Sequence, residues 1–173
     1  MRSAEDTRVH HPNRDKAASK ASKSAVVLLL VVSAALVAIV TVGGWKVQQG
    51  AQIVSIAYVI IYGVMAYYVA RWNRGVLPLA AALAILLGVV AAIAVPGWFD
   101  RDKSGYAHAA LPAGLLGLLT LMIVPIQLLL IAFAMRAFNQ QWNVEVEMTD
   151  DEYRQRYGGS GRGRRGYEPQ PQA

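Results

Sequence analysis

The chain has 173 residues, of which 55% are apolar and 16% charged, and its mean hydropathy is +0.33. This length and composition exclude a multidomain enzyme, a chain disordered throughout and an ordinary water-soluble globule, and favour a small polytopic membrane protein. Because the chain has no cysteine, disulfides, thiolate nucleophiles and cysteine-based metal sites are excluded as well.

Residues 1–24 are predicted to form a disordered basic tail, because they contain few large apolar side chains. Three lysines, Lys16, Lys20 and Lys23, come shortly before the first apolar run. Each cation near an anionic leaflet contributes about 1 kcal/mol, so we expect this tail to contact anionic lipid headgroups. A topology signal with some lipid attraction and a dedicated lipid or protein docking site both fit this pattern.

Four long stretches contain no Asp, Glu, Lys or Arg and consist mainly of Ala, Val, Ile and Leu. A helix needs about 20 apolar residues to cross the hydrocarbon core, and none of the four has the polar stripe of a water-facing helix. We therefore predict an all-α integral membrane protein with a transmembrane domain at 25–135. Its helices should lie at about 25–45, 52–70, 76–99 and 110–135. Short connections predict an antiparallel bundle in which sequential helices are neighbours.

One tryptophan follows each apolar run. Tryptophan prefers the headgroup level of a bilayer, where its ring lies partly in lipid and its N–H reaches water. We therefore interpret the four tryptophans as membrane-interface anchors: Trp45, Trp72, Trp98 and Trp142.

A few uncharged polar side chains lie inside the predicted spans. Tyr58 and Tyr62 are one helical turn apart, and Gln127 follows Pro125, which should kink the last helix. Tyr58, Tyr62 and Gln127 are candidates for a polar cleft that holds a ligand. An interhelical hydrogen bond, worth about 0.6 kcal/mol in a membrane, is the structural alternative.

The third predicted helix carries small residues at four-residue spacing. Such a stripe lets two helix backbones approach closely, because association in lipid depends on van der Waals fit. It predicts packing against another helix, either within the bundle or in a homodimer. The residues concerned are Ala80, Ala84, Gly88 and Ala92.

The connection between the third and fourth helices contains a candidate metal site. Asp100, Asp102 and Ser104 have the spacing of the first half of an EF-hand calcium loop, which this connection resembles over about seven residues. Leu111 replaces the bidentate Glu at the end of such a loop, so a full EF-hand is rejected. Two interpretations are left: a weak calcium site that also uses Tyr106, or a polar turn whose charges cancel.

After the last apolar run, residues 136–157 are interpreted as a juxtamembrane segment with a short helix at about 150–157. Thr149 and Glu152 match a capping box at the start of that helix. The preceding alternation of apolar and acidic residues is typical of a brief extended stretch. Residues 158–173 are rich in Gly, Arg and Pro, which predicts a disordered tail, and nucleic-acid binding is not expected.

The positive charges are distributed unevenly among the connections. Fourteen of the 17 Lys and Arg residues lie in the two tails and the second connection, and the first and third connections hold only Lys46, Arg101 and Lys103. The positive-inside rule then places both termini in the cytoplasm. The predicted location is the cell (inner) membrane, with a multi-pass topology.

No ionisable acid or base other than tyrosine lies inside the predicted spans, and no metal-ligand, nucleotide-binding or catalytic motif is present. Enzyme activity and a cofactor are therefore not expected. The leading hypothesis is a non-catalytic accessory, scaffold or assembly subunit of a membrane complex, with a homo-oligomer or a membrane-protein partner. The alternative is a small transporter or channel subunit for an apolar or weakly polar solute.

Overall fold

The computed structural model describes residues 7–103, 105, 107–149, 152 and 156. It divides into two compact units. The helical unit comprises Asn13–Asn143, and the terminal unit comprises Met1–Pro12 with Val144–Ala173. A single-turn helix, α1 (Pro12–Asp15), lies at the boundary between them.

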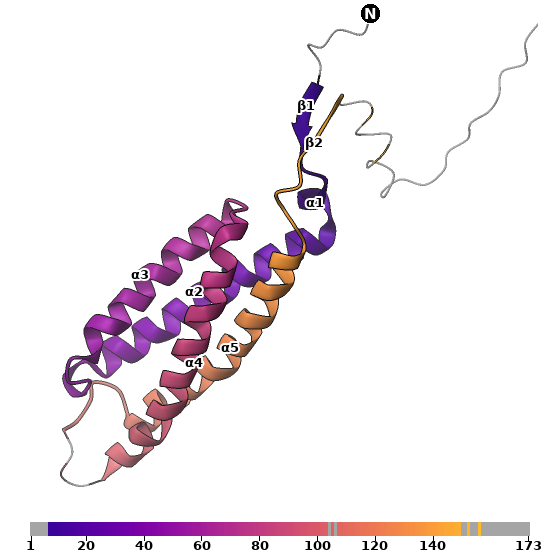
Figure 1. Cartoon of the computed structure of the whole chain (residues 1–173). Helices are drawn as coiled ribbons and strands as arrows, with labels where there is room; N and C mark the ends of the chain where they lie inside the picture. The colour runs from indigo at the N-terminus through magenta and orange to yellow at the C-terminus, as the bar shows by residue number, and fades with distance from the viewer. Residues whose placement is uncertain (1–6, 104, 106, 150–151, 153–155, 157–173) are drawn as a thin grey trace, which may run out of the picture. The chain divides into compact units, whose positions relative to one another are not determined.

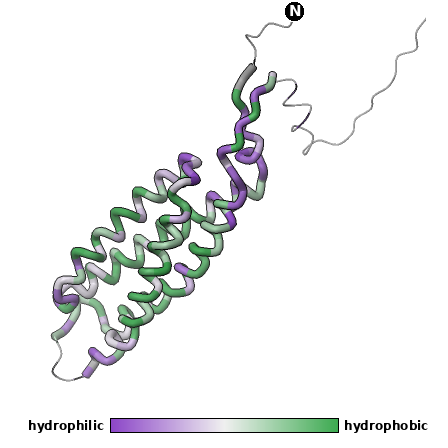
Figure 2. The backbone as a smooth tube through the Cα atoms, in the orientation of Figure 1, coloured by the Kyte–Doolittle hydropathy of each residue, from purple (hydrophilic) through white to green (hydrophobic). Residues whose placement is uncertain are grey.

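Four long helices make up the helical unit (Figure 1): α2 (Ala17–Gly43), α3 (Ala51–Ala70), α4 (Leu77–Phe99) and α5 (Ala113–Asn139). Each is long and apolar enough to cross a membrane. Hydrophobic residues run along all four helices, and hydrophilic residues are concentrated near their ends (Figure 2). The predicted all-α fold with four potential membrane-spanning helices is therefore confirmed.

Short 3₁₀ helices lie in the connections, at Trp45–Val47, Arg74–Val76 and Asp100–Asp102. Because the connections are short, the helices alternate in direction and the unit has two ends. We call the end that holds the start of α2, the α3–α4 connection and the end of α5 the Trp72 end. The opposite end, which holds the α2–α3 and α4–α5 connections, is the Trp98 end.

The helices do not pack in the order of the sequence. The helix α2 packs on both α3 and α5, and α5 packs on α4, whereas α3 and α4 make few contacts. The expectation that all sequential helices are neighbours is therefore wrong for this pair. The physical reason is that the small residues of α4 let this helix pack closely on α5, where a Cβ at Gly88 would lie 3.4 Å from Gln127.

The helix α2 begins at Ala17, well before the predicted start at residue 25. Ser19 and Ser22 are buried within residues 1–24, which were predicted to be a disordered tail. Gln140, just past the end of α5, donates hydrogen bonds to the Ser22 hydroxyl (3.0 Å) and to the Ala18 carbonyl (3.3 Å). The prediction of disorder is wrong from Ala17 onward, because contacts with a distant part of the chain stabilise a segment that has too few apolar residues to fold alone.

The terminal unit contains a two-stranded antiparallel sheet. Its strands are β1 (Thr7–His10) and β2 (Val146–Thr149), with Thr7 opposite Thr149 and His10 opposite Val146. The extended stretch predicted before the short C-terminal helix is therefore confirmed. Strand β1 is a second departure from the predicted disordered tail, since it needs a partner far away in the sequence.

The capping box is formed as predicted. The backbone N–H of Thr149 donates to the Glu152 carboxylate, and the N–H of Glu152 donates to the Thr149 hydroxyl, both at 3.4 Å. Glu152 and Arg156 are helical. The rest of the short helix expected at 150–157, and the tail at 158–173, lie outside the described residues.

Candidate functional site

A buried polar cluster joins three helices near the middle of the helical unit. The Tyr62 hydroxyl on α3 donates to Gln127 Oε1 on α5 at 2.9 Å, and Gln127 Nε2 donates to the Ser33 hydroxyl on α2, also at 2.9 Å. All three side chains are fully buried. The polar atoms of Tyr62 and Gln127, which were candidates for a ligand cleft, are therefore hydrogen-bonded within the protein. This arrangement matches the structural alternative, an interhelical hydrogen bond.

Tyr58, the third residue of the predicted cleft, lies beside this cluster. Its ring packs edge-on against Tyr62, with the ring centroids 5.7 Å apart. The Tyr58 hydroxyl donates to the Leu83 carbonyl of α4 at 3.5 Å, and the side chain is only partly buried. Tyr58 therefore adds a polar contact between α3 and α4, two helices that make few contacts with each other.

Aromatic rings and cations pack together at the Trp72 end. The rings of Trp72 and Trp142 meet edge-on at 5.2 Å, and Lys23 Nζ lies 4.1 Å from the centre of the Trp72 ring. Trp142 is fully buried, and its indole N–H donates to Gln140 Oε1 at 3.1 Å. Trp142 therefore contributes to the interior of the helical unit, and its ring has no surface to present to lipid.

The two tryptophans at the other end differ from each other. Trp45 is 49% exposed, whereas Trp98 is 7% exposed. The Trp98 ring packs so closely on the end of α2 that a Cβ at Gly44 would lie 2.5 Å from its Cη2 atom. An anchor at the headgroup level stays a prediction for Trp45 and the partly buried Trp72.

The small residues of α4 lie in two environments. Ala80 and Ala84 are fully buried, and a Cβ at Gly88 would lie 3.4 Å from the Cβ of Gln127 on α5. Ala92, the last residue of the predicted stripe, is exposed. Within the chain, the stripe therefore supports the α4–α5 contact over its first three members.

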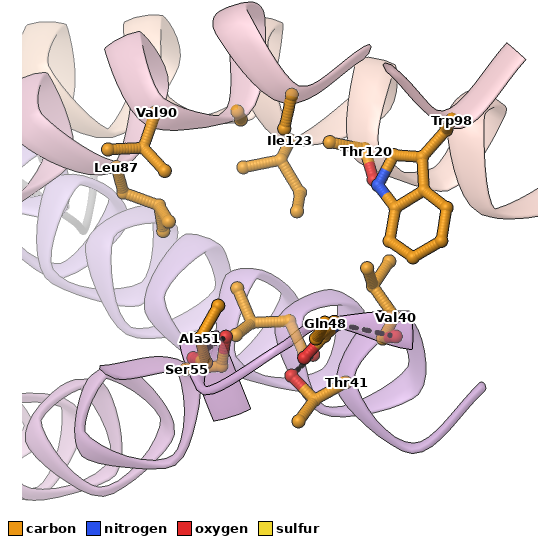
Figure 3. Close-up of a pocket in the computed structure, with 13 residues that line it drawn as sticks. Val40, Thr41, Gln48, Ala51, Ser55, Leu87, Val90, Trp98, Thr120 and Ile123 are labelled. Carbon is orange, nitrogen blue, oxygen red and sulfur yellow. Dashed lines mark hydrogen bonds between the residues drawn. The ribbon is translucent and has the colours of Figure 1, made fainter. Parts of the chain in front are cut away.

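A pocket of about 170 Å³ opens between α3 and α4 at the Trp98 end, and we call it the α3–α4 pocket (Figure 3). Most of its wall is apolar and comes from α2, α4 and α5. The side chains that form this part of the wall include Val37, Leu87, Val90, Ala91 and Ile123.

The hydroxyl groups that line the α3–α4 pocket are engaged with their own helices. Thr41 donates to the Val37 carbonyl at 2.6 Å, and Thr120 donates to the Leu116 carbonyl at 2.7 Å. Ser55 donates to the Ala51 carbonyl at 3.1 Å. These groups therefore have no proton left to offer inside the pocket.

Gln48 is the functional candidate that the sequence reasoning missed. It lines the α3–α4 pocket, and its Nε2 donates to the Val40 carbonyl at 3.1 Å. Its Oε1 is buried and has no hydrogen-bond partner among the described residues. Gln48 lies in a short connection between two apolar runs, where a polar residue is ordinary, so no sequence pattern singles it out.

The candidate calcium loop lies partly outside the described residues. Asp100 forms a salt bridge with Lys103 at 2.7 Å, and both side chains are exposed. Ser104 and Tyr106 are not described, nor is the side chain of Asp102. No group of three or more His, Cys, Asp or Glu that could hold a metal ion occurs in the part of the chain that is described. The weak calcium site stays a prediction.

No protein-family model matches the chain, and no curated protein or solved structure is significantly similar to it. Function is therefore inferred from the geometry and chemistry of the chain's own residues.

Proposed function

We propose that the protein is a non-catalytic accessory, scaffold or assembly subunit of a membrane complex. The observation that carries this proposal is the buried cluster of Tyr62, Gln127 and Ser33, which uses mid-span polar groups to hold helices together. A transporter for ions or protons needs polar groups that stay available to the solute, and these are usually ionisable. The four long apolar runs contain no Asp, Glu, Lys or Arg that could serve this purpose.

The helix α3 is the least covered of the four long helices in its most apolar segment, which leaves that segment available to a partner. Only 22% of its most apolar segment is buried inside the protein, compared with 33% for each of the three other helices. Large apolar side chains along it are exposed, among them Ile53, Ile60 and Val64. A transmembrane helix of a partner subunit would pack on this face and replace lipid there.

Both termini are proposed to lie in the cytoplasm, with the protein in the cell (inner) membrane. Three cations at the Trp72 end lie over aromatic rings: Lys23 over Trp72, Arg71 over Tyr67 and Arg74 over Phe138. This end also receives the two charged tails, so it is the more basic one. The positive-inside rule favours its placement on the cytoplasmic side.

Photo-crosslinking in native membranes tests the accessory role. A photoreactive side chain at Ile60 on α3 is expected to capture one stoichiometric membrane-protein partner. The same group at Leu128 on α5, which is 64% exposed, serves as the matched control and should capture mainly lipid. Equal capture at both positions, or none at either, would contradict the proposed docking on α3.

The alternative, a small transporter or channel subunit for an apolar or weakly polar solute, is favoured by one observation, the α3–α4 pocket. Purification of the protein from native membranes separates the two functions. A homo-oligomer that purifies without any other protein and carries solute across liposomes would replace the accessory role with this alternative. A partner that copurifies, with no flux in liposomes, supports the accessory role.

A further inference from the structure

We propose that a groove on α2, beside the end of α3, binds one anionic phospholipid, with the lipid phosphate at Lys23 and an acyl chain along α2. The groove has a volume of about 340 Å³ and lies at the Trp72 end. We call it the Lys23 groove, and the residues that line it are Lys23, Ser24, Val27, Leu28, Val31 and Ala70. This site goes beyond the accessory role proposed above, because its occupant is a lipid and not a partner subunit.

The Lys23 side chain provides the charged end of the groove, whereas the other five lining residues are uncharged. Lys23 Nζ lies 4.1 Å from the centre of the Trp72 ring and donates to the Ala70 carbonyl at 3.4 Å. This bond uses one of the three N–H groups of the ammonium, so two are left to donate. The oxygens of a phosphate accept strong hydrogen bonds from a charged donor, so a phosphate complements this ammonium.

A second cation lies at the same end of the groove. Arg71 directly follows Ala70, and its Cζ atom lies 5.2 Å from the centre of the Tyr67 ring. Neither Lys23 nor Arg71 forms a salt bridge in the part of the chain that is described. Two cations without a carboxylate partner favour a lipid with a net negative charge over a zwitterionic lipid, which carries a cation of its own.

The depth of the groove matches a lipid in one leaflet. Lys23 is the last charged residue before the charge-free run that begins at Ser24, so its ammonium lies at the headgroup level when α2 crosses a membrane. An α-helix rises by about 12 Å over the eight residues from Lys23 to Val31, which is most of one half of a 30 Å hydrocarbon core. Leu28 is 62% exposed and Val31 is 51% exposed, so both present apolar surface to an acyl chain.

Thermal unfolding of the purified full-length protein in a neutral detergent, titrated with lipid, tests this proposal. Phosphatidylglycerol should raise the melting temperature saturably. It should bind about fivefold more tightly than phosphatidylcholine with the same acyl chains, since one cation near an anionic headgroup contributes about 1 kcal/mol. Glycerol phosphate, which has the charge but no acyl chain, should not stabilise the protein at the same concentration. Equal affinity for the two lipids, or equal stabilisation by glycerol phosphate, would overturn the proposal.

A pair of lysine substitutions separates a defined site from a diffuse attraction between the basic tail and anionic lipid. Lys23→Gln should remove the preference for phosphatidylglycerol. Lys20→Gln is the matched control, because Lys20 is exposed, lies about one turn earlier on α2 and does not line the groove. A diffuse attraction would weaken equally in both variants, so equal losses, or no loss in Lys23→Gln, would contradict the site.

Two alanine substitutions test the apolar part of the groove without changing the charge. Ala70→Leu places a larger side chain in the groove and should abolish the saturable stabilisation. Ala82→Leu, at an exposed position near the start of α4, should leave lipid binding as it is in the native protein. A photoreactive side chain at Leu28 should capture lipid in native membranes. Unchanged binding in Ala70→Leu, or capture of a protein at Leu28, would refute the assignment of this groove to a lipid.

Discussion

The Gln127 side chain both accepts and donates a hydrogen bond, and the need for both functions explains why this position holds an amide. Its Oε1 accepts from Tyr62 and its Nε2 donates to Ser33, so a single side chain must be both acceptor and donor. An aliphatic residue would satisfy neither neighbour, and a charged residue would be costly at this depth in a bilayer. An amide on α5 therefore joins α2 and α3 without introducing a charge.

Substitutions in this cluster should lower the free energy of unfolding by different amounts, because its members make different numbers of hydrogen bonds. Gln127→Leu leaves two buried hydroxyls without a partner, and we expect it to lower the free energy of unfolding by about 1–2 kcal/mol. Tyr62→Phe removes one bond and leaves the buried Gln127 Oε1 without its donor, so its cost should be about 1 kcal/mol. Both values can be measured by reversible unfolding in mixed micelles.

Tyr58→Phe is the matched control for Tyr62→Phe. The two tyrosines are one helical turn apart on α3, but the Tyr58 hydroxyl makes only a 3.5 Å bond from a partly buried position. We expect its removal to change the free energy of unfolding by much less than Tyr62→Phe does. Equal effects of the two tyrosine substitutions would show that the buried cluster has no special role.

The sequence located part of this chemistry and missed the rest for a physical reason. Polar residues inside apolar runs are conspicuous, so Tyr62 and Gln127 could be selected before the fold was known. Their pairing could not be predicted, because it depends on how α3 and α5 approach across α2. Gln48 escaped notice because a connection is where polar residues are expected, and the burial of its oxygen depends on how the folded chain packs around that connection.

At the scale of an element, the buried face of α4 follows the helical repeat, whereas the predicted stripe has a strict four-residue spacing that departs from this repeat. A helix turns about 100° per residue, so four-residue spacing drifts by about 40° at every step. After three steps the stripe has rotated from fully buried Ala80 to exposed Ala92. Leu87 and Ala91 take over the buried face at that level, against α5 and the α3–α4 pocket.

Gly88 should tolerate a methyl group but not a larger side chain. A Cβ at this position makes an ordinary contact of 3.4 Å with Gln127, so Gly88→Ala is expected to be close to neutral. Gly88→Leu would force α4 and α5 apart and should destabilise the protein by about 1–3 kcal/mol. A thermal-unfolding series checks this, and unchanged stability and oligomer size in Gly88→Leu would contradict the packing described for α4.

Gly44 should tolerate even less, because its neighbours are rigid. An added Cβ would lie 2.5 Å from the buried Trp98 ring and 3.0 Å from the Val40 carbonyl oxygen. We expect Gly44→Ala to lower the melting temperature by displacing Trp98. Gly63→Ala is the control, since nothing lies within 4 Å of its Cβ position in α3. Because alanine has a higher helix propensity than glycine, this substitution should stabilise the protein by about 0.5–1 kcal/mol.

Which elements exist was predictable, but where the first helix and strand lie was not. The four apolar runs identify α2 to α5 because only a helix can satisfy the backbone of such a run in lipid. The early start of α2 depends on Gln140, and β1 depends on β2, which is more than a hundred residues away in the sequence. Local composition contains no information about such distant partners.

At the scale of the whole molecule, the first and last residues of the helical unit lie at the same end. Asn13 donates to the Gln141 carbonyl at 3.0 Å, and Arg14 donates to the Trp142 carbonyl at 3.1 Å. This follows from an even number of spans, and it means that both tails begin on one side of a membrane. The orientation of the whole protein therefore reduces to a choice between the Trp72 end and the Trp98 end.

Single-cysteine labelling decides this choice cleanly, because the chain has no cysteine of its own. Ala107→Cys lies in the exposed connection at the Trp98 end, and Asn139→Cys lies at the exposed end of α5. If the basic end faces the cytoplasm, a membrane-impermeant maleimide should label Ala107→Cys in intact cells and leave Asn139→Cys unlabelled. Both should react once the membrane is permeabilised, which controls for accessibility. The reverse pattern would place the Trp72 end outside, and labelling of both in intact cells would contradict the single membrane crossing by α5 that separates the two positions.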